Sequence, residues 1–164
     1  MIELQLVGVR VELPTNQPIV LLKELEGERY LPIWIGPVEA TAIALGMQGI
    51  ETQRPMTHDL MRDLLQGLEV AVDRIVITEL REGTFYAEIQ MSRNGDKVSV
   101  SSRPSDALAL AVRMNLTIFA AEDVLDEASI AVRDDEEEGE SPNADQEVER
   151  FREFLEQVSP EDFK

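Results

Sequence analysis

Apolar and polar residues alternate along the start of the chain, which is the pattern of half-buried β-strands. Ile2, Leu4 and Leu6 alternate with polar residues, and a second alternating set begins at Val7 in the opposite phase. A change of phase within one strand indicates a β-bulge, because one extra residue sends the following side chains to the other face. The pattern therefore predicts a long strand with a bulge near Gly8.

Further along, strand-like and helix-like segments take turns. Residues 83–92 carry apolar side chains at every second position, and the Asn94-Gly95 pair that follows is a strong signal for a hairpin turn. Alanine- and leucine-rich segments are typical of helices. The pattern predicts strands over 19–22, 29–35, 70–80, 83–92, 96–101 and 116–119, and helices over 37–48, 57–66, 104–114 and 121–127. The second helix places five apolar residues on one face: Leu60, Met61, Leu64, Leu65 and Leu68.

Two parts of the chain repeat one unit, which is a strand, a glycine-containing turn, a second strand and a helix opened by proline. The copies span 19–47 and 85–114, and their helices begin at Pro37 and Pro104. Such a repeat predicts an internally duplicated α+β domain with pseudo-twofold character.

A run of acidic residues divides the chain. The domain is expected over 1–133, an acidic linker over 134–142, and a C-terminal amphipathic helix and tail over 143–164. The apolar stripe of this last helix consists of Val148, Phe151, Leu155 and Val158. Two interpretations stay open: the helix packs on the domain or on a neighbouring subunit, or it is a separate tail that binds a partner.

Composition removes several classes of site. The chain has no cysteine, which excludes disulfides, thiolate metal sites and a cysteine nucleophile, and it has one histidine. No basic segment followed by an apolar one opens the chain, and no apolar run is long enough to cross a membrane. We therefore expect a cytoplasmic protein that does not bind membranes.

The charge is strongly negative. There are 33 acidic and 15 basic residues, for a net charge of −18, and residues 1–133 contain 20 of the acids and 12 of the bases. No block of lysine or arginine is present, whereas non-specific binding of nucleic acids depends on cations that neutralise phosphates. Any chemistry on nucleic acid would therefore need local arginines, a metal ion or both.

Each copy of the repeat places a carboxylate two residues after the proline that opens its helix, namely Glu39 and Asp106. A structural role would explain this position, because an acid in the first turn complements the helix dipole. A functional role would follow if the duplication brought the two helix starts to one cleft. The pair would then suit Mg²⁺ or Mn²⁺, which prefer oxygen ligands.

A second polar group surrounds the single histidine, His58. Thr57 is expected to cap the helix, which places His58 and Asp59 in its first turn, with Arg54 just before it. A neutral imidazole there suits a general base or a metal ligand. The alternative is that His58 donates a hydrogen bond and only fixes the loop.

A third group lies at the start of the last long helix. Arg103 and Ser105 flank Pro104 at a helix N-terminus, where anions bind readily, and an arginine can hold a phosphate with two hydrogen bonds. In the structural alternative, Arg103 pairs with an acid of its own capped helix. The glycine-rich and serine or histidine motifs of kinases, Rossmann enzymes and common hydrolases are absent from the sequence.

Together these segments resemble the bifunctional nuclease (BFN) domain family over about residues 1–130, and residues 151–163 resemble the tail of bacterial, especially actinobacterial, stand-alone members. The resemblance rests on Leu31-Pro32-Ile33-Trp34-Ile35-Gly36, Glu39-Ala40, Arg54-Pro55-Met56-Thr57-His58-Asp59-Leu60 and Arg103-Pro104-Ser105-Asp106-Ala107. It implies a compact α+β domain with a mixed, largely antiparallel sheet, cleavage of DNA and RNA, and a tendency to form homo-oligomers.

Two hypotheses follow. The first is a metal-dependent nuclease of broad specificity, with nucleic acid as its partner. The roles expected in it are metal ligands at Glu39, Asp59 and Asp106, a base at His58, and substrate contacts at Arg54, Thr57, Arg103 and Ser105. The second is a non-catalytic oligomeric module that binds a ligand or a partner, which the acidic charge favours.

Overall fold

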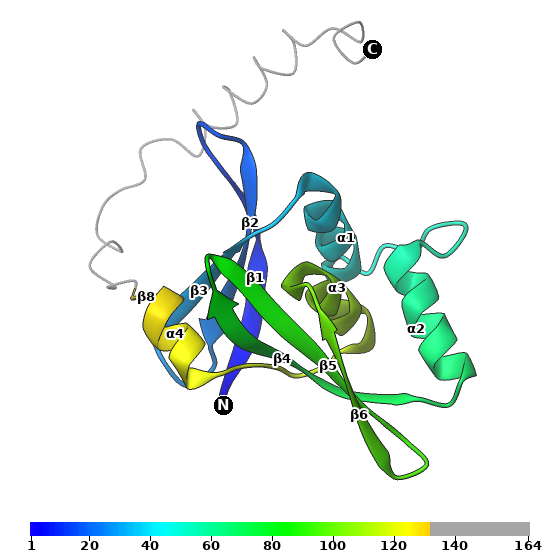
Figure 1. The fold of residues 1–164 in the computed structure, drawn as a ribbon. Helices are drawn as coiled ribbons and strands as arrows, with labels where there is room; N and C mark the ends of the chain where they lie inside the picture. Colours follow the sequence, from blue (N-terminus) through cyan, green and yellow to red (C-terminus); the bar gives the residue numbers. More distant parts are fainter. Residues whose placement is uncertain (132–164) are drawn as a thin grey trace, which may run out of the picture. The chain divides into compact units, whose positions relative to one another are not determined.

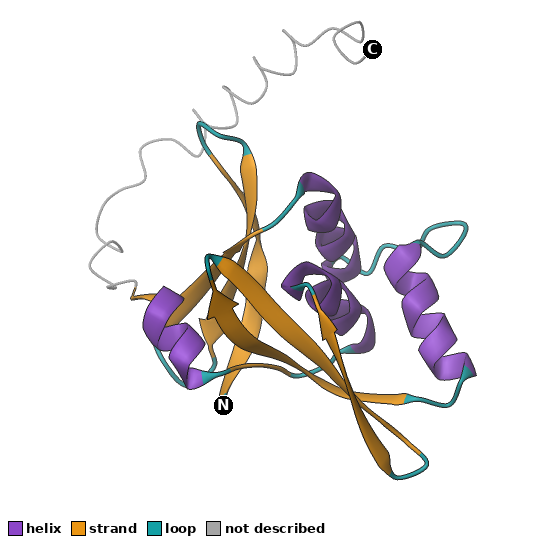
Figure 2. Cartoon of the chain, in the orientation of Figure 1, coloured by secondary structure: helices purple, strands orange, loops and turns teal. Residues whose placement is uncertain are grey.

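The computed structural model describes residues 1–131 of the chain (Figures 1 and 2). The acidic linker expected over 134–142 and the helix expected over 143–164 lie outside these residues. The strands are β1 (Ile2–Glu12), β2 (Gln17–Glu24), β3 (Arg29–Trp34), β4 (Ala71–Arg81), β5 (Thr84–Arg93), β6 (Asp96–Ser102), β7 (Ile118–Ala120) and β8 (Ile130–Ala131). The helices are α1 (Pro37–Met47), α2 (Thr57–Gly67), α3 (Pro104–Met114) and α4 (Glu122–Ala128).

The strands form one sheet in the order β6-β5-β4-β7-β1-β2-β3-β8. Strands β4 and β7 run parallel to each other, and the other described neighbours are antiparallel. The predicted α+β fold with a mixed, largely antiparallel sheet is therefore confirmed. The short strand β7 lies between β4 and β1 and so joins the two halves of the sheet.

The predicted duplication is confirmed in the order of the elements. The first half runs β1-β2-β3-α1 and the second runs β4-β5-β6-α3, each with three antiparallel strands followed by a helix. Both helices begin with proline, whose fixed φ and missing N–H suit the first helical position. Helix α2 lies between the two halves in the chain, and His58 in its first turn contacts Asp106 in the first turn of α3.

Two of the irregular positions in the sheet fall where the sequence predicts them. The register between β1 and β2 shifts between Leu6 and Gly8, which confirms the bulge. Asn94 and Gly95 have φ angles of 52° and 88°, and two successive positive angles are what a tight hairpin turn with the twist of its strands requires.

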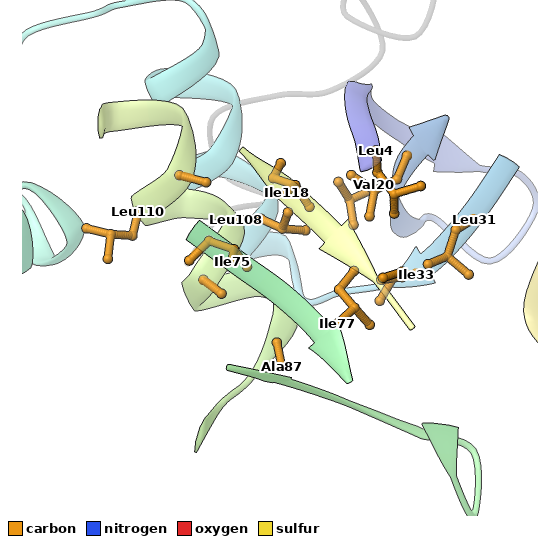
Figure 3. Close-up of a cluster of buried hydrophobic side chains, with 14 of the residues drawn as sticks. Leu4, Val20, Leu31, Ile33, Ile75, Ile77, Ala87, Leu108, Leu110 and Ile118 are labelled. Atoms are coloured by element: carbon orange, nitrogen blue, oxygen red, sulfur yellow. The ribbon is translucent and has the colours of Figure 1, made fainter. Parts of the chain in front are cut away.

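The core lies between the sheet and its helices (Figure 3). Helix α3 is its centre, because residues 107–111 are all buried. Alanine alternates with leucine along this segment, so that α3 can approach both the strands and α1 closely. The largest fully buried side chains are Val20, Leu22, Leu31, Ile43, Ile75, Ile77, Leu108, Leu110 and Leu125.

The apolar face predicted for α2 is only half covered. Met61 and Leu65 pack against the core, whereas Leu60, Leu64 and Leu68 are each more than half exposed. Within residues 1–131, α2 packs mainly on α3, and a single neighbour covers only one side of the stripe.

Curvature of the sheet brings distant strands together. Helix α4 packs on both β3 and β4, which are not neighbours in the sheet, while α1, α2 and α3 lie together on the other side (Figure 1). The same curvature brings the β4–β5 turn to the end of β3, where both line one hollow.

Among the described helices, none has the length and apolar character needed to cross a membrane.

Gly46 allows α1 to lie close to α3. A Cβ atom at this position would overlap Val112 and the guanidinium of Arg113. Replacing Gly46 with valine is therefore expected to lower the free energy of unfolding by about 2 kcal/mol, because packed helices cannot absorb the added volume. Urea unfolding measures this change. Gly67→Ala on α2 is the matched control, since nothing lies within 4 Å of its added methyl group, and an equal loss in both variants would contradict the explanation.

Candidate active site

Four polar side chains meet where α1, α2 and α3 begin. Asp106 accepts hydrogen bonds from two residues: His58 Nε2 lies 3.0 Å from its Oδ1, and Arg103 Nε lies 2.7 Å from its Oδ2. Arg103 also donates from Nη2 to Asp106 Oδ1 at 3.0 Å and from Nη1 to Glu39 Oε1 at 2.9 Å. We call Glu39, His58, Arg103 and Asp106 the helix-start cluster.

The duplicated halves position this cluster. Glu39 and Asp106 occupy the third position of α1 and α3, and each follows a proline at the first position. The residue before each proline differs between the copies, with Gly36 in the first and Arg103 in the second. The arginine supplies the side chain that bridges both carboxylates, across 64 positions of the chain to Glu39. The structure therefore brings Glu39 and Asp106 to one place, as in the functional interpretation, and Arg103 also pairs with an acid of its own helix, as in the structural one.

Both carboxylates of the cluster are held in the ionised form. Burial alone would raise the pKa of Asp106, but the hydrogen bonds from Arg103 and His58 outweigh it and keep the pKa below its ordinary value. The pKa of Glu39 is lowered by its own backbone N–H, which donates to the carboxylate, and then by Arg103. Two negative groups thus share one guanidinium, which leaves an excess of negative charge when His58 is neutral.

The bond to Asp106 determines the form of His58. This imidazole belongs to a buried residue, which is 9% exposed. An ionised carboxylate can only accept hydrogen bonds. A neutral His58 therefore carries its proton on Nε2, and its Nδ1 is the basic nitrogen.

Asp59 does not join the cluster. Its Oδ1 accepts a hydrogen bond from Arg113 Nε at 2.8 Å, and its Oδ2 accepts one from the Met56 backbone N–H at 3.0 Å. Arg113 is almost fully buried and also donates to the carbonyl oxygens of Ala42 and Ala109, at 2.9 and 2.7 Å. Asp59 therefore joins α2 to α3 and, through Arg113, to α1.

The donor set for a metal ion is accordingly smaller than expected. Within residues 1–131, no group of three histidine, aspartate or glutamate side chains lies close enough together to hold a metal ion. Of the three expected ligands, Glu39 and Asp106 are joined through Arg103, and Asp59 is engaged with Arg113. Glu39 and Asp106 are thus the two expected ligands that lie near one another, and Arg103 binds both of them.

The other predicted site residues are Arg54, Thr57 and Ser105. Thr57 was expected to cap α2, but the cap is Met56 and Thr57 is the first helical residue. The helix begins one residue early because the Asp59 carboxylate binds the backbone N–H of Met56, as in a capping box. Arg54 is exposed in the loop before α2, and Ser105 is buried at the start of α3.

A hollow of about 450 Å³ borders the cluster at Glu39 and Arg103. Its wall combines the end of β3, the β4–β5 turn and the start of α3. The lining residues are Ile33, Trp34, Ile35, Gly36, Glu39, Gly83, Thr84, Phe85, Arg103, Pro104 and Ser105. Trp34 and Phe85 were not among the predicted site residues, although Trp34 follows the buried Ile33 in the alternation of β3 and so points to the other face. We call this space the Trp34 hollow.

A decrease of pH is expected to weaken the fold in part through Asp106. Its folded-state pKa is lowered, so its contribution to stability is fully present above the unfolded pKa of about 4 and is lost as the pH falls through the folded value. Asp106→Asn should therefore lose less of its free energy of unfolding than the parent as the pH falls below about 4. Urea unfolding at a series of pH values tests this, with the exposed Asp63→Asn as control. Parallel curves for the parent and Asp106→Asn would contradict it.

The chain is similar to proteins of one family. Residues 20–133 match the model of the bifunctional nuclease domain. An uncharacterized protein of Mycobacterium tuberculosis is 50% identical over 163 residues, which are 99% of this chain and 98% of that protein. Bifunctional nuclease 2 of Arabidopsis thaliana is 30% identical over 112 residues, and bifunctional nuclease 1 of Oryza sativa subsp. japonica is 24% identical over 106 residues. These matches cover 65% and 63% of this chain but only 34% and 32% of the plant proteins.

Proposed function

Because the chain belongs to the bifunctional nuclease domain family, we propose that it hydrolyses phosphodiester bonds of RNA and DNA at the helix-start cluster. The observation that carries the proposal is the 3.0 Å bond between His58 Nε2 and Asp106 Oδ1, with Arg103 bound to the same carboxylate. A buried base oriented by an ionised acid, beside a cationic group, is an arrangement that can activate water and hold a phosphate.

In this mechanism the nucleophile is water, because DNA has no 2′-hydroxyl group. Nδ1 of His58 takes a proton as the water oxygen bonds to phosphorus. The bond from phosphorus to the leaving sugar oxygen breaks, and that oxygen takes a proton from solvent water. Asp106 stays ionised and stabilises the imidazolium that forms. Arg103 donates to the phosphate oxygens, where charge accumulates.

A divalent cation, Mg²⁺ or Mn²⁺, is part of the proposal. Glu39 and Asp106 would hold it, since both are ionised and Mg²⁺ is commonly bound through one or two carboxylates together with water and phosphate. When bound, the cation would polarise the phosphate and acidify the attacking water. The excess of negative charge in the cluster supports this requirement, because an anionic substrate needs a compensating cation.

The proposal is tested by cleavage of labelled RNA and single-stranded DNA in Mg²⁺, Mn²⁺ or EDTA. We expect cleavage that EDTA abolishes, and a loss of about 100-fold or more in Asp106→Asn, because that variant no longer orients His58 as an ionised acid does. Asp73→Asn is the matched control, since Asp73 pairs with Lys97 on the β4–β5–β6 strands and not with the cluster. Equal cleavage by the parent and Asp106→Asn would place the activity elsewhere or in a contaminant.

The negative charge favours one other function. With a net charge of −18, the chain would suit a non-catalytic module that binds a ligand or a second copy of itself, and the exposed leucines of α2 offer a surface for self-association. A folded protein with no cleavage under any of the conditions above would favour this alternative. The homo-oligomer stays a prediction that sedimentation measurements can test.

A further inference from the structure

The Trp34 hollow has an aromatic wall as well as a polar one. Trp34 is the single tryptophan of the chain and is 50% exposed. Phe85, at the start of β5, lines the same space. Because β3 alternates, Leu31 and Ile33 are buried in the core while Trp34 stays outside it. The fold therefore leaves a large aromatic surface uncovered next to the helix-start cluster.

The hollow is also lined by the group that we assign to the phosphate, Arg103. Its side chain is 63% exposed, even though it binds both Glu39 and Asp106. A ligand in the hollow would thus contact an aromatic side chain and a guanidinium at once. A nucleotide has the matching chemistry, a flat base joined to a phosphate, and pockets of 300–1,000 Å³ commonly hold ligands of that size or larger.

The aromatic wall also bears on which form of nucleic acid fits. A base offers its face to a protein side chain only when it is unpaired and unstacked, as in single strands, loops and ends. In a duplex both faces are covered by neighbouring base pairs. We propose that Trp34 stacks on an unpaired base beside the phosphate bound at Arg103, so that the site selects single-stranded nucleic acid. This inference rests on the proposed function for the identity of the ligand.

Binding can be measured without cleavage. Because Trp34 is the only tryptophan, its fluorescence reports contact with a base directly. The probes are a 12-nucleotide phosphorothioate oligothymidylate, the same strand in a duplex, and an abasic strand of the same length, each with and without Mg²⁺. We expect quenching by the single strand and little or none by the duplex or the abasic strand.

Variants separate stacking from structure. Trp34→Ala should bind a labelled single strand about 5- to 100-fold more weakly, as expected for loss of one stacked base, while Trp34→Phe should retain most of the affinity. Val38→Ala is the control, an exposed apolar residue on the neighbouring helix α1, and urea unfolding shows whether each variant folds. Equal affinity of Trp34→Ala and the parent, or equal quenching by the duplex or the abasic strand, would overturn the inference, as would the absence of any quenching.

Failure of the stacking role of Trp34 can be distinguished from failure of the proposed nuclease activity. A protein that cleaves RNA but binds equally well without Trp34 would keep the nuclease and lose the stacking role. A protein that binds single strands through Trp34 but cleaves nothing would lose the nuclease and keep a nucleic-acid-binding hollow.

Discussion

Replacing His58 with glutamine is expected to lower the rate of phosphodiester cleavage by about 100-fold or more, which is the usual contribution of a general base. The glutamine amide can still donate to Asp106, so that the contact between α2 and α3 is kept. It has no basic nitrogen to replace Nδ1, so that the attacking water loses its proton acceptor.

Two further measurements make this prediction specific. Gln66→Ala, an exposed change on the same helix, should leave cleavage unchanged. His58→Ala should regain part of its activity when imidazole is added, which a purely structural role for His58 would not explain. Full cleavage by a folded His58→Gln protein would show that the base is another group.

Replacing Asp59 with alanine is expected to lower the free energy of unfolding by about 3 kcal/mol. The cause is Arg113, whose side chain is 6% exposed and would lose its carboxylate partner in a buried position. Removal of one partner from a buried ion pair costs about 3–5 kcal/mol, because the remaining charge stays uncompensated. Urea unfolding measures the loss.

A double variant tests that cause. Asp59→Ala combined with Arg113→Met removes both charges and should recover a substantial part of the stability, because the unpaired charge is gone. Asp63→Ala is the control on the same helix, where an exposed ion pair with Arg62 is worth about 1 kcal/mol or less. If the double variant were as unstable as the sum of the two single variants, the ion pair would not be the source of the loss.

Local patterns predicted most of the fold, because the elements are marked by residues that act over short distances. The predicted helix 104–114 has the observed bounds of α3, since proline opens it and an asparagine with positive φ ends it. The same kind of signal located the bulge at Gly8 and the turn at Asn94. The repeated proline and acid raised the meeting of Glu39 and Asp106 as one of two interpretations, because equivalent parts of a duplicated domain can take equivalent places.

Features that depend on contacts between residues far apart in the sequence were not predicted from local patterns. Asp59 was expected beside a metal ion, but its partner is Arg113, 54 positions later, and no local pattern links the two residues. The sequence pattern placed the leucines of α2 on one face of the helix. Their spacing does not predict how much of that face a neighbouring element covers. The Trp34 hollow depends on the curvature of the sheet, which joins segments from both halves of the chain.

The position of β7 has a consequence for how the protein is made. Within residues 1–131, this three-residue strand is the element that pairs with both β1 and β4, through Ile118–Ala120. The ribosome synthesises the chain from its N-terminus, so β1, β2, β3 and α1 leave the exit tunnel first. The edge of β1 that pairs with β7 stays unpaired until residue 120 has also left the tunnel. A chain stalled before Ile118 would hold Glu39, His58 and Asp106 but would lack the strand that joins its two halves. Completion of the sheet, and with it the lasting arrangement of the cluster, is thus a late event in synthesis.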